Sequence, residues 1–415
     1  GVDAQTNNEE SAEYYYMSRT TYNGQFTGRH QLNDIRSFDW SVGYAYANNC
    51  MPDRRRYIVN DAIEQGHLGL TSANDIEREF TRLNEHTASL NVNYKDKFEV
   101  GQIEPQLKVG AYGDYRTRSY RARDFIYTYN TSDNTLPDGF RYMDIPNELL
   151  TEANYGADKL YMLENVRWTN NYDGNNWLMA GYVGVNIPVE KFNVYAGVRY
   201  EYNKMELISN TRNYEKSPRS MFYTTSDFFP SVNASYKFTE EHQARVSYGR
   251  SINRPEFREV SPSVYYDFDL ASNVQGNTDL KAAYINNVDL SYEFYPAPGE
   301  LMSVSLFYKN FKNPIEWTYT VNGGTSLTYS YENAEGADTY GIEVEIKKNL
   351  DFIGLDDFSV NFNGALIKSK VRFAEGSNER DRAMQGQSPY LINAGLFYQP
   401  KNLGLNVALL YNRIG

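Results

Sequence analysis

The chain has 415 residues and carries 38 tyrosines, 21 phenylalanines and 4 tryptophans, yet its mean hydropathy is only −0.66. No apolar run approaches the ~20 residues that a membrane-spanning helix needs. The many aromatic residues exclude a disordered chain. The formal net charge of −12 argues against nucleic acid as the main partner, because a polyanion would be repelled.

The two ends of the chain suggest an internal fragment of a longer protein. The chain begins at Gly1 without a methionine or a signal peptide, and its last residues, from Tyr411 to Gly415, stop inside a repeating pattern. We therefore expect the missing signal peptide to say nothing about location. The one cysteine, Cys50, can form neither an internal disulfide nor a cysteine-rich metal site.

Apolar and polar residues alternate along most of the chain, for example in segments 192–203, 288–295 and 403–412. Successive side chains of a β-strand point to opposite faces, so alternation predicts strands with one apolar and one polar face. About 14 such strands are predicted, several of them long against the usual ~5–6 residues. They lie near 13–24, 34–48, 85–97, 103–121, 176–187, 191–208, 226–238, 243–252, 283–295, 301–311, 339–349, 357–372, 389–399 and 403–413.

The connections between these strands alternate between short and long. The short ones lie near 98–102, 188–190, 239–242, 296–300, 350–356 and 400–402. The long ones lie near 49–84, 122–175, 209–225, 253–282, 312–338 and 373–388. Alternate turns of an up-and-down meander lie at the same end, so the sheet should have a short-turn end and a long-loop end.

These features together predict an all-β fold, a transmembrane antiparallel up-and-down β-barrel of which this chain is an incomplete segment. Tyrosines near the strand ends on the apolar parity suit the membrane interface, where the ring lies in lipid and the hydroxyl in water. They are Tyr44, Tyr46, Tyr94, Tyr236, Tyr248, Tyr308 and Tyr411. The alternative is a soluble all-β protein, for which the strands are too long and the tyrosines too many.

The residues that could carry covalent chemistry form no known pattern. The histidines, His30, His67, His86 and His242, show no paired or HExxH spacing, and no nucleophile elbow or nucleotide-binding glycine loop is present. The sequence therefore predicts no catalytic residue, no metal site and no cofactor.

Two groups of arginines could bind anions, because guanidinium groups suit bidentate contact with phosphate or carboxylate. Arg54, Arg55 and Arg56 are predicted in a long loop, and Arg116, Arg118, Arg121 and Arg123 near the end of a strand that runs to the long-loop end. The latter four are the candidates for contact with an anionic solute or with lipopolysaccharide. The alternative is that they are solvated charges on the rim.

The long loops are also aromatic, and loops on a rigid barrel commonly carry ligand contacts. Flat aromatic faces suit sugar rings and chelates. The candidate ligand-binding residues are Tyr127, Tyr129, Trp168, Tyr172, Tyr265, Tyr266 and Phe268. The alternative is that these rings pack loop against loop.

Several motifs resemble the barrel of TonB-dependent outer-membrane receptors, and the resemblance is strongest from about 245 to 415. It rests on the stretch from Ser247 to Phe257 (SYGRSINRPEF), the GNTDL of 276–280, the YENA of 331–334 followed by GIEVE at 341–345, and the MQGQSPY of 384–390. Single motifs are weak, whereas their order and spacing are more specific. The resemblance implies a barrel of ~22 strands around a plug, of which these 14 would be numbers 6 to 19.

The resemblance also implies a function for residues 1–415 as part of one barrel domain without its plug. Such receptors, in the outer membrane of Gram-negative bacteria, capture a scarce solute and import it with energy delivered by TonB, ExbB and ExbD. The solute could be a siderophore, a corrinoid or a glycan, and a surface lipoprotein partner would point to glycans. The implied surroundings are outer-membrane lipid and lipopolysaccharide.

Two other functions remain open at this point. A passive porin or adhesin would use the same barrel without a plug, and a barrel enzyme would need a serine and histidine on neighbouring strands. A sheet of 14 strands cut from a larger barrel also leaves two unpaired edges. We therefore expect a strongly curved, open sheet, without pairing between segments 13–24 and 403–413.

Overall fold

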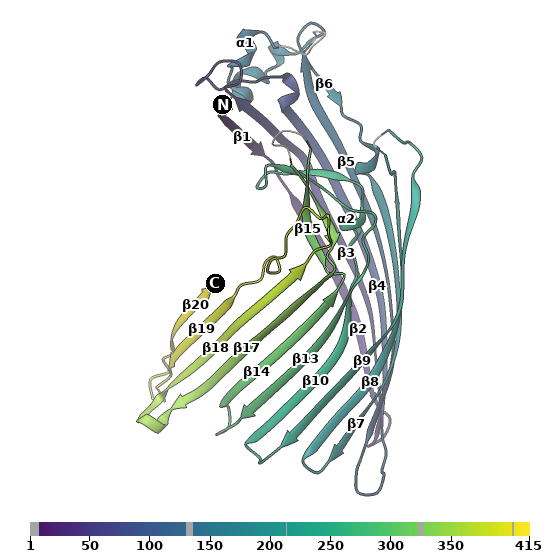
Figure 1. Ribbon diagram of the computed structural model, residues 1–415, viewed down its shortest axis with the longest axis vertical. Coiled ribbons are helices and arrows are strands. Elements are labelled where there is room, and N and C mark those ends of the chain that lie inside the picture. The colour runs from purple at the N-terminus through teal and green to yellow at the C-terminus, as the bar shows by residue number, and fades with distance from the viewer. Residues whose placement is uncertain (1–7, 130–135, 213, 323–326, 401) are drawn as a thin grey trace.

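The computed structural model describes residues 8–129, 136–212, 214–322, 327–400 and 402–415. One curved antiparallel sheet of 16 strands dominates it (Figure 1). In sheet order its main path is β1 (Glu9–Tyr14), β3 (Arg36–Asn60), β4 (Ile76–Lys97), β5 (Gln106–Tyr129), β7 (Tyr172–Val189), β8 (Phe192–Ser209), β9 (Arg219–Lys237), β10 (His242–Asn253), β13 (Ala283–Phe294), β14 (Leu301–Lys312), β17 (Gly336–Leu350), β18 (Leu355–Arg372), β19 (Tyr390–Tyr398) and β20 (Val407–Ile414). Two further strands, β2 (Ser18–Gln31) and β6 (Leu160–Glu164), pair with β3 and β5.

The sheet is open, as the sequence predicts. Among the described residues, β20 pairs only with β19, and the opposite edge is formed by β1 and β2 on β3. Figure 1 shows β20 at the lower left, apart from β1 near the N-terminus at the top. The fold is therefore a segment of a barrel wall that does not close on itself among the described residues.

The two faces of the sheet differ in polarity because the residues alternate in register from strand to strand. Val246, Leu290, Leu306, Ile342 and Leu366 stand directly opposite one another on five neighbouring strands of the convex face. These side chains are 37% to 61% exposed, so their apolar surface is left for lipid. On the concave face the corresponding row is polar: Gln243, Glu293, Ser303, Glu345, Asn363, Asn393 and Asn412.

Tyrosines border the apolar band on the convex face at both ends. At the long-loop end, the hydroxyl of Tyr248 donates to Asn286 Oδ1 at 3.0 Å, and that of Tyr308 donates to Asp338 Oδ1 at 2.7 Å. At the short-turn end, the hydroxyl of Tyr94 donates to Asp96 Oδ2 at 3.1 Å. Each ring thus lies on the apolar band while its hydroxyl reaches a polar group, as expected of residues at a membrane interface.

The predicted strands are all present, but several extend further toward the long-loop end than the sequence predicts. β3 continues to Asn60 and β4 begins at Ile76, so the predicted loop 49–84 shrinks to 61–75, and the predicted loop arginines Arg54 to Arg56 lie on β3. The first predicted strand, 13–24, is split into β1 and β2. Backbone pairing continues above the apolar band, where hydropathy no longer alternates, and the sequence signal therefore stops before the strand does.

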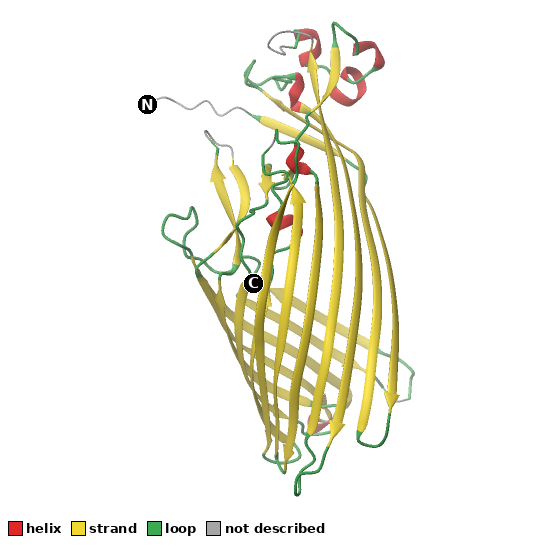
Figure 2. Ribbon diagram, turned by 90° about the vertical axis from the view of Figure 1, so that its right-hand side faces the viewer, coloured by secondary structure: helices red, strands yellow, loops and turns green. Residues whose placement is uncertain are grey.

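The long connections contain structure of their own. A second sheet of four short strands has the order β11 (Val264–Asp267), β12 (Ser272–Gln275), β16 (Leu327–Asn333) and β15 (Ile315–Val321), with β12 and β16 parallel. Helical turns are α1 (Asp138–Arg141), α2 (Phe257–Val260), η1 (Ala73–Asp75), η2 (Ile145–Leu149), η3 (Glu152–Asn154), η4 (Trp168–Asn170) and η5 (Asp351–Ile353). Most of them gather at the long-loop end (Figure 2). In the described part of the chain, no helix has the length and apolarity to cross a membrane.

Candidate ligand-binding site

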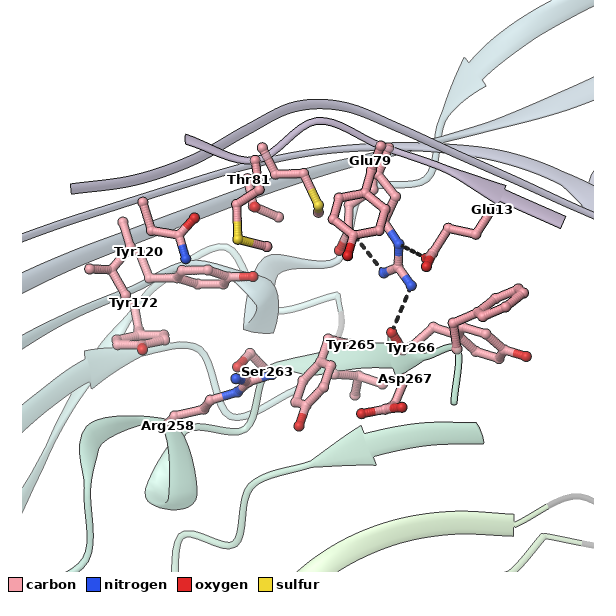
Figure 3. Close-up of a pocket in the computed structure, with 18 of the residues that line it drawn as sticks. Glu13, Glu79, Thr81, Tyr120, Tyr172, Arg258, Ser263, Tyr265, Tyr266 and Asp267 are labelled. Carbon is pink, nitrogen blue, oxygen red and sulfur yellow. Dashed lines mark hydrogen bonds and ion pairs between the residues drawn. The ribbon is translucent and has the colours of Figure 1, made fainter. Parts of the chain in front are cut away.

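A cavity of about 450 Å³ lies at the long-loop end, between the concave face of the barrel wall and the loop that carries α2 and β11 (Figure 3). The wall contributes inward-facing residues of β1, β3, β4, β5 and β7. The loop contributes Arg258 and residues 263–269 from the opposite side. The cavity has the size of a typical small-molecule site.

Arg54 connects the wall of the cavity to the loop. Its guanidinium forms ion pairs with Glu13 of β1 and, at 2.9 Å, with Glu79 of β4. Its Nη2 also donates to the backbone carbonyl of Tyr266 at 3.0 Å. One side chain therefore holds three separate segments of the chain around the cavity, and its charge is already neutralised by two carboxylates.

A β-bulge turns Arg54 toward the cavity. The register of β3 and β4 pairs Met51 with Thr81 and then Arg54 with Glu79, so β3 has one more residue than β4 over this interval. A bulge of this kind reverses which parity faces inward. Arg56 also faces the loop, where its guanidinium carbon lies 3.6 Å from the centroid of the Tyr266 ring.

Arg258 differs from the other cations of the cavity. Its guanidinium carbon lies 3.7 Å from the centroid of the Tyr265 ring, and in the described part of the chain it has no ion pair. Figure 3 shows its side chain pointing along the cavity beside Tyr265. Burial raises the pKa of the Tyr265 hydroxyl, while the positive charge of Arg258 opposes that shift. Arg258 can therefore offer its donors to an anionic or strongly accepting group of a ligand.

The opposite wall of the cavity is aromatic. Tyr172, the first residue of β7, is buried and stacks on Tyr120 of β5 with a centroid distance of 5.3 Å. Arg118 lies beside them and forms an ion pair of 2.6 Å with Glu85. The cavity thus brings together five of the sequence-predicted residues: Arg118, Tyr172, Tyr265, Tyr266 and Phe268.

The loop is fixed to the wall by the buried ring of Phe257, the first residue of α2. It belongs to a hydrophobic cluster with Tyr172, Met205, Leu207, Val260 and Leu280. The guanidinium carbons of Arg116 and Arg118 lie 4.9 and 5.3 Å from the centroid of its ring. Arg116 also forms an ion pair with Glu256 at 3.1 Å. These inward arginines therefore hold the loop in place.

Two asparagines from the family-like motifs join the loops to one another. Asn277 donates from Nδ2 to the carbonyl of Tyr331 at 2.9 Å, and its backbone N–H donates to the carbonyl of Glu259. Asn333 donates from Nδ2 to the carbonyl of Lys281 at 2.9 Å. The described contacts of these motif residues are structural ones, which position the loop on which Arg258 and Tyr265 lie.

The remaining aromatic candidates lie outside the cavity. Tyr127 is 3% exposed and packs in a separate hydrophobic cluster with Leu136, Leu149 and Leu160, and Tyr129 packs against the same cluster. Trp168 lies in η4, where Lys216 Nζ is 5.7 Å from its ring. The structure thus places Tyr127, Tyr129 and Trp168 apart from the four aromatic candidates that line the cavity.

The four arginines of β5 also do not form one rim. Arg116 and Arg118 face the concave side, whereas Arg121 and Arg123 face outward and pair with Asp173 and Glu164, each at 2.8 Å. Arg118 and Arg121 are three positions apart, and this odd separation is the signal in the sequence that places them on opposite faces. The sequence gives no reason to select Arg258, Glu13 or Glu79, and it places Arg54 in a loop, since nothing local identifies the bulge or the folded loop.

A curved wall with an apolar outer face, a polar inner face and loops folded over its mouth defines a transmembrane β-barrel of the outer-membrane type. A family model for the TonB-dependent receptor-like β-barrel matches residues 2–415. The chain therefore belongs to the TonB-dependent receptor β-barrel family. A sequence comparison with curated proteins finds no match.

Solved structures of several import receptors and transporters are similar to the chain in fold. The ferric-catecholate import receptor Fiu of E. coli K12 has a TM-score of 0.62 and 14% identity, over 97% of this chain and 54% of that one. The siderophore receptor PiuA of Acinetobacter baumannii has a TM-score of 0.62 and 11% identity, over 96% of this chain and 55% of that one. The ferric citrate transporter FecA has a TM-score of 0.53 and 11% identity, over 95% and 59%. The chain thus spans little more than half the length of these proteins.

Proposed function

We propose that residues 1–415 are part of the barrel domain of an active import receptor in the outer membrane of a Gram-negative bacterium. The cavity between the barrel wall and the folded loop carries this proposal. It lies on the concave side at the long-loop end, where a solute from outside would arrive first. Family membership supports the same reading, because the named neighbours are import receptors.

The lining of the cavity favours a solute that carries oxygen acceptors and flat surfaces. Arg258 supplies charged donors without a carboxylate partner among the described residues, and Tyr265 supplies an aromatic ring beside it. Arg54 and Arg118 add little free charge, since each is paired with a carboxylate. Siderophores, corrinoids and glycans all offer such groups, and the siderophore receptors among the similar structures favour a ferric siderophore.

The binding role can be tested on the full-length protein with a panel of ferric siderophores, cobalamin and oligosaccharides. For the solute that binds, Arg258→Gln should weaken binding by roughly 10- to 100-fold, because a hydrogen bond from a charged group is lost. Arg219→Gln is a matched control, since Arg219 lies at the same end of the barrel but pairs with Glu215 outside the cavity. Equal affinity for both variants would place the solute elsewhere.

The energy coupling is the second part of the proposal. We infer that TonB, with ExbB and ExbD, drives import through a plug that fills the polar interior. Uptake of the bound solute should then stop in cells that lack TonB, while surface binding persists. Uptake that continues at the same rate without TonB would instead support a passive porin, and binding without any uptake would support an adhesin.

A further inference from the structure

A group of arginines and phenylalanines lies on the convex face near the long-loop end, away from the cavity. We call it the outer arginine cluster. It consists of Arg78, Phe80 and Arg82 on β4, and of Arg121, Arg123 and Phe125 on β5. The strand register places Arg82 directly opposite Arg121 and Phe80 directly opposite Arg123. Two positive charges therefore face each other across a strand pair, an arrangement that normally destabilises a sheet.

The ion pairs of the described residues leave this cluster positively charged. Arg121 pairs with Asp173 and Arg123 with Glu164, and both arginines are at least half exposed. Arg78 shares the single carboxylate of Asp53 with Arg55. Arg82 has no ion pair or hydrogen bond in the part of the chain that the structure describes. With Arg55 included, five arginines thus meet three carboxylates, although the whole chain has a net charge of −12.

The two phenylalanines hold the guanidinium groups in place. The rings of Phe80 and Phe125 meet edge to face, with centroids 5.6 Å apart. The guanidinium carbon of Arg123 lies 4.9 Å from the Phe125 ring, and that of Arg78 lies 5.6 Å from the Phe80 ring. The cluster is therefore a packed surface with both apolar and cationic groups, unlike a set of separate solvated side chains.

The height of the cluster is fixed by the outward residues of β4. From the long-loop end they read Arg78, Phe80, Arg82, Asn84, His86, Ala88, Leu90, Val92 and Tyr94. His86, which hydrogen-bonds the Tyr44 hydroxyl at 2.7 Å, marks one border of the apolar band. Tyr94 marks the other border. At ~3.4 Å per residue and a tilt of ~40°, Arg82 lies roughly 10 Å beyond His86. That is the level of the polar headgroups of the outer leaflet.

We propose that the outer arginine cluster binds the phosphorylated headgroup of a glycolipid in the outer leaflet, with a phosphate between Arg82 and Arg121. A phosphate would neutralise the two opposed charges and accept bidentate hydrogen bonds from both guanidinium groups. The phenylalanines and the tyrosine belt below would contact the acyl chains. The proposal requires only that the barrel spans an outer membrane, so it stands apart from the solute-binding site.

The test uses the full-length protein in detergent micelles and lipid A with two phosphates as the probe, with binding measured by native mass spectrometry. The double variant Arg82→Gln/Arg121→Gln should bind lipid A at least ~10-fold more weakly than the parent. Arg36→Gln is the matched control, because Arg36 is an outward-facing arginine of β3 at the short-turn end and pairs with Asp96. Arg36→Gln should bind lipid A as tightly as the parent protein does. Lipid A without its phosphates should bind the parent protein weakly, to the same degree as intact lipid A binds the double variant.

Three results would overturn the proposal: unchanged lipid A affinity in the double variant, an equal loss in Arg36→Gln, or parent-like binding of dephosphorylated lipid A. Complete displacement of lipid A by millimolar inorganic phosphate would identify a site for free anions and would also overturn it. Heat-modifiable mobility on gels checks that each variant is folded. If the double variant does not fold, Arg82→Gln alone provides the test, since it breaks no ion pair among the described residues.

Discussion

Leu306 offers the most direct test of the face assignment. It lies on the convex side of β14, directly opposite Leu290 and Ile342, and the residue is 48% exposed. On this strand it lies between Met302 near the short-turn end and Tyr308 in the tyrosine belt. Leu306→Arg therefore places a charge inside the apolar band, where the cost is ~2–4 kcal/mol near the middle of the bilayer.

That cost corresponds to a factor of roughly 30 to 900 in the folding equilibrium constant. The matched control is Ser305→Arg, one residue away on the concave face, where Ser305 stands opposite Ser291 and Glu343. A new arginine there meets a carboxylate and polar neighbours, so its effect should be small. The assay is urea unfolding of the full-length protein in lipid vesicles. If both variants unfold at the same urea concentration, the assignment of the lipid and lumen faces is wrong.

Three further predictions concern the loops. In Gly276→Ala, the new methyl carbon would lie 2.1 Å from a backbone carbonyl oxygen, so the loop 253–282 should detach and become sensitive to protease. Gly249→Ala is the control, because its methyl carbon would meet nothing within 4 Å and the loop should stay resistant to protease. Phe257→Ala empties a fully buried site and should cost ~3–5 kcal/mol in the stability of the docked loop, seen as faster hydrogen exchange in segment 253–282. The hydrogen bond from Lys370 holds the pKa of Asp381 below its usual range. The stabilisation that this ion pair gives the loop is therefore present above the ordinary carboxyl pKa of ~3.9 and is lost as the pH falls below that value. Hydrogen exchange in segment 373–388 should rise in acid, and Asp381→Asn should remove this pH dependence.

The cavity and the outer arginine cluster use the same strands for different purposes. On β5, Arg118 faces inward and supports the cavity, while Arg121 faces outward at the level of the headgroups. The two sites should therefore respond independently to substitution: loss of Arg258 should leave lipid binding unchanged, and loss of Arg82 should leave solute binding unchanged.

The sequence by itself determined the strands, their two faces and the open sheet. This was possible because the signal is local and repeated: lipid demands apolar side chains at every second residue, so Val246, Leu290 and Leu306 could be placed on one face from parity alone. The alternation of short and long connections then fixed which end carries the loops. Both inferences require only the chain order and the two-residue period.

The tertiary structure decided where the functional residues meet. The bulge between Met51 and Arg54 reverses the inward parity of β3, and no local pattern announces it. The parallel pairing of β12 with β16 joins segments more than 50 residues apart. β11, which carries Tyr265, pairs with β12 in the same sheet, and Tyr265 lines the cavity at the concave face of the barrel wall. Loops obey no period, because their partners are chosen by packing across the whole mouth of the barrel. For this reason the sequence indicated aromatic loops and arginines as candidates, while only the fold separated Tyr127 in a hydrophobic cluster from Tyr265 in a cavity.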